Sequence, residues 1–194
     1  SVDPAPANDP KAPRAWNRYA YAGANPLRFV DPRGKWEEDF HLYLTNYLAL
    51  QAGFGPADAK LIAISDQAVD DEYSAADLTH PSNWGRHFSN DPTLDKQVRR
   101  SLAGDDLVRT GNLLHTVEDW YSHNAYLKKG HLGIEGVDDP SQNPQAALAA
   151  ARRVFILLGG DRSKLDNAFL EKWVKEKDKR KRIEMLLPLI RVAQ

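Results

Sequence analysis

The sequence predicts an all-α fold, a single helical bundle that follows a short irregular segment. Up to about residue 35 the chain is rich in Pro, Gly and Asn, and helical patterns follow almost without interruption. Apolar residues in 144–158 recur at the three- and four-residue spacing of an amphipathic helix. Within Gly111–His123, imidazole and acidic side chains recur every four residues, which places them on one helix face.

Length and composition restrict the class of protein. The 194 residues suffice for one domain with a substantial core. A net charge of −1 offers no bulk electrostatic case for a nucleic-acid partner. No apolar run is long enough to span a bilayer, and no signal peptide is expected at Ser1. Because Cys is absent, disulfides and thiolate zinc sites are excluded, and any metal must be held by His, Asp and Glu.

The first two helices are predicted from turn residues as much as from apolar spacing. Residues 1–35 are expected to form only short strands and turns. The first helix is expected over 37–52, ending at Gly53, a residue suited to the left-handed position after a helix. The second is expected over 56–71, with Pro56 in its first turn. Its predicted buried face comprises Leu61, Ile62, Ile64, Ala68 and Val69.

The middle of the chain is predicted to alternate between loops and helices. Residues 73–92 contain several breakers and are expected to form a loop. A short helix over 95–103 and a longer one over 105–125 follow. Asp105 or Asp106 is expected to cap the longer helix, since a carboxylate can accept the unpaired N–H groups of a first turn.

The C-terminal part is predicted to be helical after another loop. Residues 128–144 are rich in Gly, Asp and Pro, and an amphipathic helix over 144–158 follows. The last helix or helices are expected over 163–192. Within them, KEKDKRKR (Lys175–Arg182) mixes both charges, which favours a solvated helix face over a binding patch.

Polar residues at expected core positions indicate a metal site. All six histidines lie between residues 41 and 131. Buried carboxylates are costly unless they are paired or bound to a cation, and helix bundles commonly build metal sites from side chains of facing helices. Three predicted helices offer such inward-facing ligands: His41 on the first, Asp66 and Asp70 on the second, and His115, Asp119 and His123 on the third. A structural hydrogen-bond network among the same groups is the alternative.

The N-terminal segment carries a resemblance to a known family. NRYAYAGANPL (Asn17–Leu27) and DPRG (Asp31–Gly34) resemble the end of the core region of Rhs/YD-repeat proteins. In that family the core forms a large β-shell, cleaves itself at about this point, and releases a toxin or effector. The resemblance implies that 1–35 is the end of an Rhs core or linker, and that 36–194 is an all-helical effector domain delivered into a target cell. Its partners would be the Rhs shell of its parent protein and a cognate immunity protein.

A second resemblance concerns the predicted helices. HFSNDPT (His87–Thr93), GNLLHTVED (Gly111–Asp119) and GHLGIE (Gly130–Glu135) are similar, in order, to segments of zinc-dependent phospholipases C, an all-helical family of trinuclear zinc enzymes. The resemblance implies that fold and two or three Zn²⁺ ions. Together with the helix stripes it suggests metal ligands at His41, Asp66, Asp70, His87, His115, Asp119, His123, His131 and Glu135.

The sequence departs from the phospholipase pattern at two points, and it also resembles a second group of proteins. The histidine that follows Asp119 comes sooner than in the phospholipases, and the glycines of GHLGIEG favour a loop for His131 and Glu135. AGFGPADAKLIAISDQAVDD (Ala52–Asp71) is shared more obviously with a set of uncharacterised helical proteins.

These patterns predict a zinc-dependent phosphodiester hydrolase, most consistent with a phospholipase C-like toxin. Phosphodiester hydrolysis needs charge neutralisation on the phosphate and a nucleophile stronger than neutral water, and clustered zinc supplies both. The catalytic residues are expected to be Asp70, His115 and Asp119, and the resemblance to the phospholipases implies that Asp70 bridges two ions and orients the water. Glu118, Asn112 and Asn124 are candidates to orient the imidazoles.

Two other functions remain open from the sequence. A P1-type single-strand nuclease toxin would share the helical fold, and would bind nucleic acid in a local groove with stacking aromatic residues. A non-catalytic helical module, which binds a partner or perturbs membranes, would use the polar stripes only as a structural network.

Overall fold

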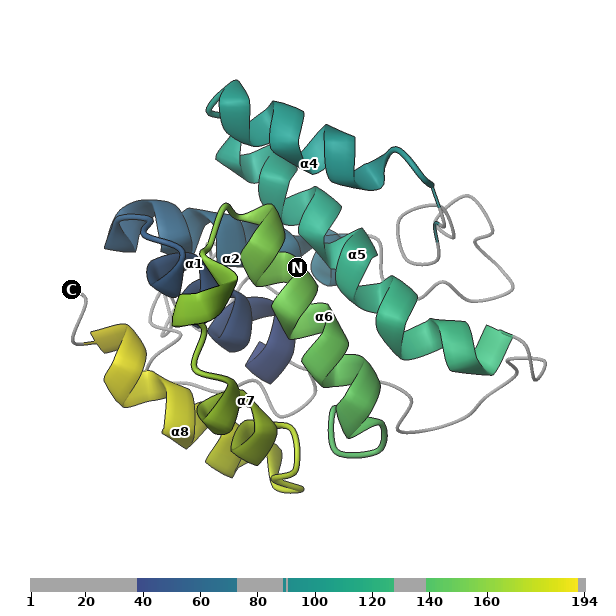
Figure 1. Ribbon diagram of the computed structural model, residues 1–194, viewed down its shortest axis with the longest axis vertical. Helices are drawn as coiled ribbons and strands as arrows, with labels where there is room; N and C mark the ends of the chain where they lie inside the picture. Colours follow the sequence, from purple (N-terminus) through teal and green to yellow (C-terminus); the bar gives the residue numbers. More distant parts are fainter. Residues whose placement is uncertain (1–37, 73–88, 90, 128–138, 192–194) are drawn as a thin grey trace, which may run out of the picture.

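The computed structural model describes residues 38–72, 89, 91–127 and 139–191 (Figure 1). In this part of the chain every regular element is a helix, which confirms the predicted all-α class. Of residues 71, 72, 123–127 and 191 only the backbone is described. The predicted strands and turns of 1–35 and most of the two predicted loops, at 73–92 and 128–144, lie outside the described residues.

The first helical segment consists of two kinds of helix. A π-helix, η3 (Asp39–Leu44), continues directly into the α-helix α1 (Thr45–Gln51). All six residues of η3 are buried. The segment ends as predicted at Gly53, whose φ of 102° is in the left-handed region that favours glycine. The prediction of one regular helix over 37–52 therefore gave nearly the right limits but the wrong hydrogen-bond pattern in its first half.

Helix α2 (Pro56–Glu72) packs most extensively against α5, and its buried face differs from the predicted one. Ile62 and Val69 are buried as predicted. The prediction was wrong for Leu61 and Ile64, which are 41% and 44% exposed. The helix instead turns a partly polar face inward, one that includes Asp66, because α5 and η3 both pack on that side.

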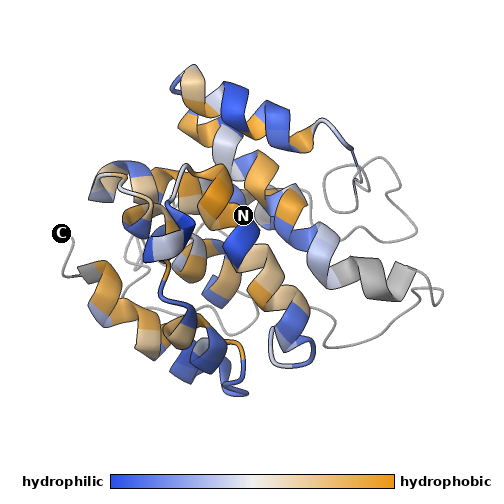
Figure 2. Cartoon of the chain, in the orientation of Figure 1, coloured by the Kyte–Doolittle hydropathy of each residue, from blue (hydrophilic) through white to orange (hydrophobic). Residues whose placement is uncertain are grey.

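Helices α4 (Leu94–Ala103) and α5 (Leu107–Leu127) form a hairpin, with α4 beside the first half of α5 (Figure 1). Asp106 is the residue that caps α5: its Oδ1 accepts the backbone N–H of Arg109 at 3.0 Å. Figure 2 shows hydrophilic and hydrophobic residues alternating along α4, as expected of an amphipathic surface helix.

The C-terminal part forms a mostly apolar layer. Helix α6 (Pro144–Leu157) begins with Asn143 as its cap and Pro144 in its first turn. The predicted helical range 163–192 divides into the short 3₁₀-helix η5 (Arg162–Lys164) and two α-helices, α7 (Asn167–Trp173) and α8 (Lys179–Arg191). Buried apolar side chains from these elements join those of η3, α1, α2 and α5 in one core.

One member of the charged run Lys175–Arg182 contradicts the predicted solvated face. Arg182 is only 1% exposed, and its guanidinium forms ion pairs with Asp39 and Asp139. The other residues of the run form a turn and the exposed first turn of α8. No helix within the described ranges is both long enough and apolar enough to cross a bilayer.

Candidate metal centre

Three helices bring the central predicted ligands together. Helix η3 supplies His41, α2 supplies Asp66 and Asp70, and α5 supplies His115 and Asp119. The side chains of His41, Asp66 and His115 are fully buried, that of Asp119 is 3% exposed, and that of Asp70 is 14% exposed. Asp70 is thus the member of the group that solvent reaches most easily.

A glycine allows the two longest of these helices to touch. A Cβ at Gly111 would lie 2.3 Å from the carbonyl oxygen of Ile62 and 2.9 Å from the backbone nitrogen of Asp66. No side chain fits there, so the backbones of α2 and α5 are in direct contact. Because His115 follows Gly111 by about one helical turn, this contact brings its imidazole within 3.3 Å of both Asp66 and Asp70.

The two imidazoles direct their Nε2 atoms at the same pair of carboxylates. Their ring centroids are 4.3 Å apart. His115 Nε2 lies 3.3 Å from Asp70 Oδ1 and 3.2 Å from Asp119 Oδ2. His41 Nε2 lies 3.9 Å from Asp70 Oδ2 and 3.7 Å from Asp119 Oδ1. Ligands about 2.0–2.2 Å from a tetrahedral zinc ion are about 3.3–3.6 Å apart, and these imidazole–carboxylate separations are close to that range.

The opposite edges of the imidazoles face a second pair of carboxylates. His41 Nδ1 lies 2.5 Å from Glu118 Oε2, and Thr45 donates its hydroxyl hydrogen to Glu118 Oε1 at 2.9 Å. Asp66 Oδ1 lies 3.0 Å from His41 Nδ1 and 3.3 Å from His115 Nδ1. At His41 the Glu118 carboxylate can hold the proton on Nδ1, which leaves the Nε2 lone pair for a metal.

Two groups of side chains are close enough to hold an ion, and they share one imidazole. His41, His115 and Asp119 form the first group, and His41, Asp66 and Glu118 form the second. A neutral imidazole has one nitrogen that carries a proton and one that can bind a metal. We therefore interpret the Nε2 side as the ion site and the Nδ1 side as its support. This interpretation gives Asp66 an orienting role, whereas the sequence suggested that it was a ligand.

The hydrogen bonding and the net negative charge of this cluster suit a bound cation. Asp66 is fully buried, and within the described residues neither of its oxygens has a hydrogen bond of good geometry. Counting only the clustered side chains, four carboxyl groups accompany two imidazoles. Because a metal binds imidazoles only in their neutral form, four ionised carboxylates would give the cluster a charge of −4, and one divalent ion would reduce this charge to −2.

In the absence of an ion the cluster retains protons. Burial and the charge of His115 lower the pKa of His41, but Asp66 and Glu118 outweigh them and raise it well above 6.5. Burial likewise lowers the pKa of His115, and Asp119, Asp70 and Asp66 raise it well above 6.5. Burial and the charge of Asp66 raise the pKa of Glu118 to about 8, against the opposing hydrogen bonds from His41 and Thr45. A metal ion must therefore displace protons in order to bind.

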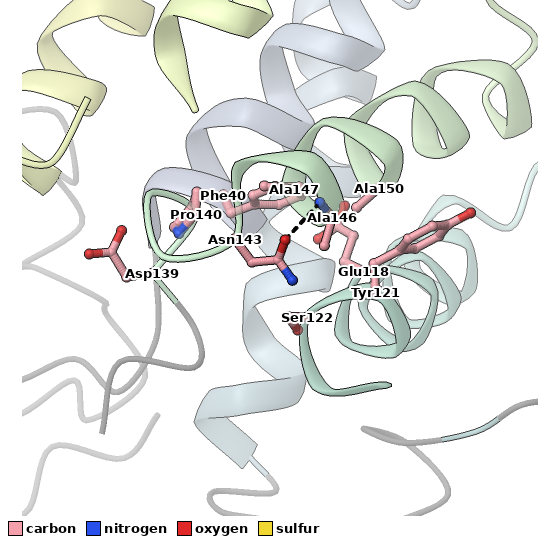
Figure 3. A pocket seen from close by; sticks show the side chains of 10 residues that line it. All are labelled: Phe40, Glu118, Tyr121, Ser122, Asp139, Pro140, Asn143, Ala146, Ala147 and Ala150. Atoms are coloured by element: carbon pink, nitrogen blue, oxygen red, sulfur yellow. Dashed lines mark hydrogen bonds between the residues drawn. The ribbon is translucent and has the colours of Figure 1, made fainter. Parts of the chain in front are cut away.

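Glu118 also lines a small cavity between α5 and the start of α6 (Figure 3). Its volume is about 20 Å³, which is room for about one water molecule. Its walls are mostly apolar and include Phe40, Ala147 and Ala150. The cavity is too small for a phosphodiester, so substrate access is better sought on the side of Asp70.

Several predicted residues cannot be placed. His87, His131 and Glu135 lie outside the described residues, and so does the side chain of His123, although its backbone belongs to α5. Of the three candidate partners for the imidazoles, Glu118 contacts His41. The side chain of Asn124 lies outside the description, and within the described part no hydrogen bond joins Asn112 to an imidazole.

The comparisons with known proteins give one family match. Residues 37–103 are similar to a family of unknown function, DUF6765. The matching region contains His41, Asp66 and Asp70 but ends before α5, which supplies His115 and Asp119. It also includes the stretch Ala52–Asp71. No curated protein and no solved structure matches the chain. About a third of the chain is therefore similar to a family whose function is unknown.

Proposed function

We propose that this protein is a metal-dependent phosphodiester hydrolase whose divalent ion is held by His41, His115, Asp70 and Asp119. The observation that carries the proposal is the convergence of two buried Nε2 atoms on the same two carboxylates, at separations of 3.2–3.9 Å. Imidazole and carboxylate are ligands that suit Zn²⁺, and the chain has no thiol to offer.

The side chains around the site have different roles in the proposed hydrolysis. When bound, a divalent ion supplies Lewis-acid activation of water and neutralises charge on phosphate oxygens. Glu118 contacts His41 from the side opposite Nε2 and so orients this imidazole before substrate arrives, while Asp66 lies 3.3 Å from His115 Nδ1. Asp70, which is 14% exposed, is the ligand at the accessible side, and we assign it the role of orienting the attacking water and accepting its proton.

The substrate class rests on the resemblance to zinc-dependent phospholipases C, and we propose a phospholipid head group as the phosphodiester. We further propose that the helical domain is a toxin delivered by an Rhs protein and neutralised in its own cell by an immunity protein. That proposal rests on Asn17–Leu27 and Asp31–Gly34, which lie outside the described residues.

Metal analysis followed by two substrate assays tests the proposal. The purified protein is expected to retain zinc, to release phosphorylated head groups from phosphatidylcholine or phosphatidylethanolamine vesicles, and to lose this activity in chelator. His115→Ala and Asp119→Asn are expected to abolish the activity, while Arg153→Ala, at an exposed ion pair, serves as the matched control. Cleavage of RNA or single-stranded DNA instead of lipid would identify the nuclease alternative. A protein that binds no zinc and keeps full stability in chelator is a non-catalytic module.

A further inference from the structure

The helix turn that carries His41 is unusual. Helix η3 (Asp39–Leu44) has the wide hydrogen-bond pattern of a π-helix, which is rare and occurs mostly in single turns near functional sites. Its C-terminal end is tied to the metal centre by Thr45, whose hydroxyl contacts the Phe40 carbonyl at 3.4 Å and Glu118 Oε1 at 2.9 Å. The same Glu118 carboxylate contacts His41, so one end of the turn is fixed from the site itself.

The other end of the turn is fixed from the C-terminal layer. Asp39 is fully buried and forms an ion pair with Arg182 of α8, a residue far away in the sequence. The guanidinium of Arg182 also contacts Asp139 Oδ1 at 3.0 Å and donates to the carbonyl of Glu176 at 2.6 Å. Arg182 is 1% exposed, so this charge is surrounded by protein groups rather than by solvent.

An aromatic contact supports the same connection. The rings of Phe40 and Trp173 meet edge to face, with centroids 5.9 Å apart and planes at 67°. Trp173 Nε1 in turn donates to the carbonyl oxygen of Arg182 at 3.0 Å. Asp39 is therefore held by α8 and Phe40 by α7. The next residue, His41, belongs to the metal centre.

We infer that Asp39 and Arg182 are positioning residues for His41: their buried ion pair fixes the π-helical turn so that the imidazole faces the ion site. The inference rests on the metal centre proposed above. A buried ion pair adds little stability compared with apolar residues of similar size, but the charge-assisted hydrogen bond from Arg182 Nε to Asp39 Oδ2 is directional. Its removal should therefore affect the metal centre more than the fold.

The test removes both charges together, so that neither is left buried alone. Asp39→Leu/Arg182→Met is expected to remain folded by circular dichroism and to bind zinc about tenfold more weakly, at the lower end of the effect of groups that orient metal ligands. Amide hydrogen exchange in the peptide that spans the π-helix should become faster in the metal-free variant. The matched control is Asp95→Leu/Arg153→Met, which removes an exposed Asp–Arg pair with contacts of 2.5 and 3.2 Å and should leave both readouts unchanged.

The outcomes separate this inference from the proposed function. If the unmodified protein binds no zinc, the metal centre itself is wrong and the inference falls with it. If the unmodified protein binds zinc and the folded double variant binds it equally well, with unchanged exchange, the positioning role is overturned and the metal centre stands. Should the double variant fail to fold, Asp39→Asn keeps the shape and removes the charge. Weaker zinc binding in this variant supports the inference, and an unchanged Kd overturns it.

Discussion

Around His41 and His115 the fully buried side chains are mostly ionisable, whereas in the layer formed by α6, α7 and α8 they are mostly apolar. The members of that layer that are less than 2% exposed include Phe155, Leu170, Trp173 and Leu186. Apolar burial stabilises a fold without directional demands, while buried carboxylates and imidazoles cost stability unless they find partners. The difference indicates that the C-terminal layer maintains the fold, and it supports the proposal that the polar centre holds a metal ion.

The largest expected effect on stability comes from the apolar layer. Phe155 is fully buried on α6, and Phe155→Ala removes its ring and leaves a cavity. We expect the free energy of unfolding to fall by about 3–5 kcal/mol, measured by urea denaturation. In the fraction that remains folded, the zinc Kd should stay the same, because Phe155 lies on α6, which supplies none of the clustered side chains. Equal losses of stability and zinc affinity would show that the two regions are not separable.

The polar centre should respond in the opposite way. Asp119→Asn keeps the size of the side chain and removes one of four clustered negative charges, while His115 still faces Asp66 and Asp70. The metal-free stability should stay within about 1 kcal/mol of the unmodified protein. The zinc Kd should weaken by more than about 100-fold, because even groups behind the ligands are worth about 10–100-fold. Isothermal titration calorimetry measures the affinity, and retention of tight binding would remove Asp119 from the ligand set.

The contact between α2 and α5 affects both the stability of the fold and the geometry of the polar centre. Gly111→Ala places a methyl group 2.3 Å from the carbonyl oxygen of Ile62. Alanine normally stabilises a helix relative to glycine by about 1 kcal/mol, but overpacking is expected to win and to cost about 1–3 kcal/mol net. Separation of the helices should also weaken zinc binding. At Gly55 an added Cβ meets its nearest neighbour only at 3.9 Å, so Gly55→Ala is the control and should be close to neutral. A stabilised Gly111→Ala would show that the two helices are not in such close contact.

The dependence of stability on pH should differ between the metal-free and zinc-bound protein. The pKa of Glu118 is raised from 4.5 to about 8, and those of His41 and His115 are raised above 6.5, so the folded state binds more protons than the unfolded chain. The metal-free free energy of unfolding should therefore fall as pH rises, from about 4.5 to about 8 for Glu118 and from about 6.5 upward for the imidazoles.

Zinc must displace these protons, so its affinity should increase over the same range. Thermal unfolding from about pH 5 to about pH 9, with and without zinc, measures both trends. Parallel curves would mean that the metal does not bind at these groups.

The smallest effect is expected at the surface. Arg153 and Asp95 form an ion pair in which the side chains are 44% and 38% exposed. Arg153→Ala should lower the free energy of unfolding by less than about 1 kcal/mol, because solvent and salt screen the pair. A larger loss, measured by denaturation at two salt concentrations, would show that exposed pairs support this fold more than the buried layer suggests.

Local signals in the sequence predicted the helices and the centre of the site well. Pro56 and Gly53 limit their helices as expected, and the His115–Asp119 spacing does place both groups on one face. The predicted ligands whose side chains the structure describes converge because each lies on the buried side of its own helix; they are His41, Asp66, Asp70, His115 and Asp119. These features depend on neighbours within one or two turns, which a sequence displays directly.

The features that were missed depend on contacts between distant segments. Nothing in DFHLYL distinguishes a π-helix from an α-helix, and Arg182 belongs to a charged run that is otherwise exposed. The exposure of Leu61 and Ile64 follows from where α5 packs on α2, which depends on the glycine at 111. Glu118 was predicted as a candidate to orient the imidazoles, but the identity of the imidazole that it contacts, His41, required the fold.

The most direct test of the metal centre is a crystal grown with zinc and measured at the zinc absorption edge. We predict an anomalous peak about 2.0–2.2 Å from His41 Nε2, His115 Nε2 and the carboxylates of Asp70 and Asp119. A structure without a peak there, in which both Nε2 atoms make ordinary hydrogen bonds to protein groups, would contradict the account.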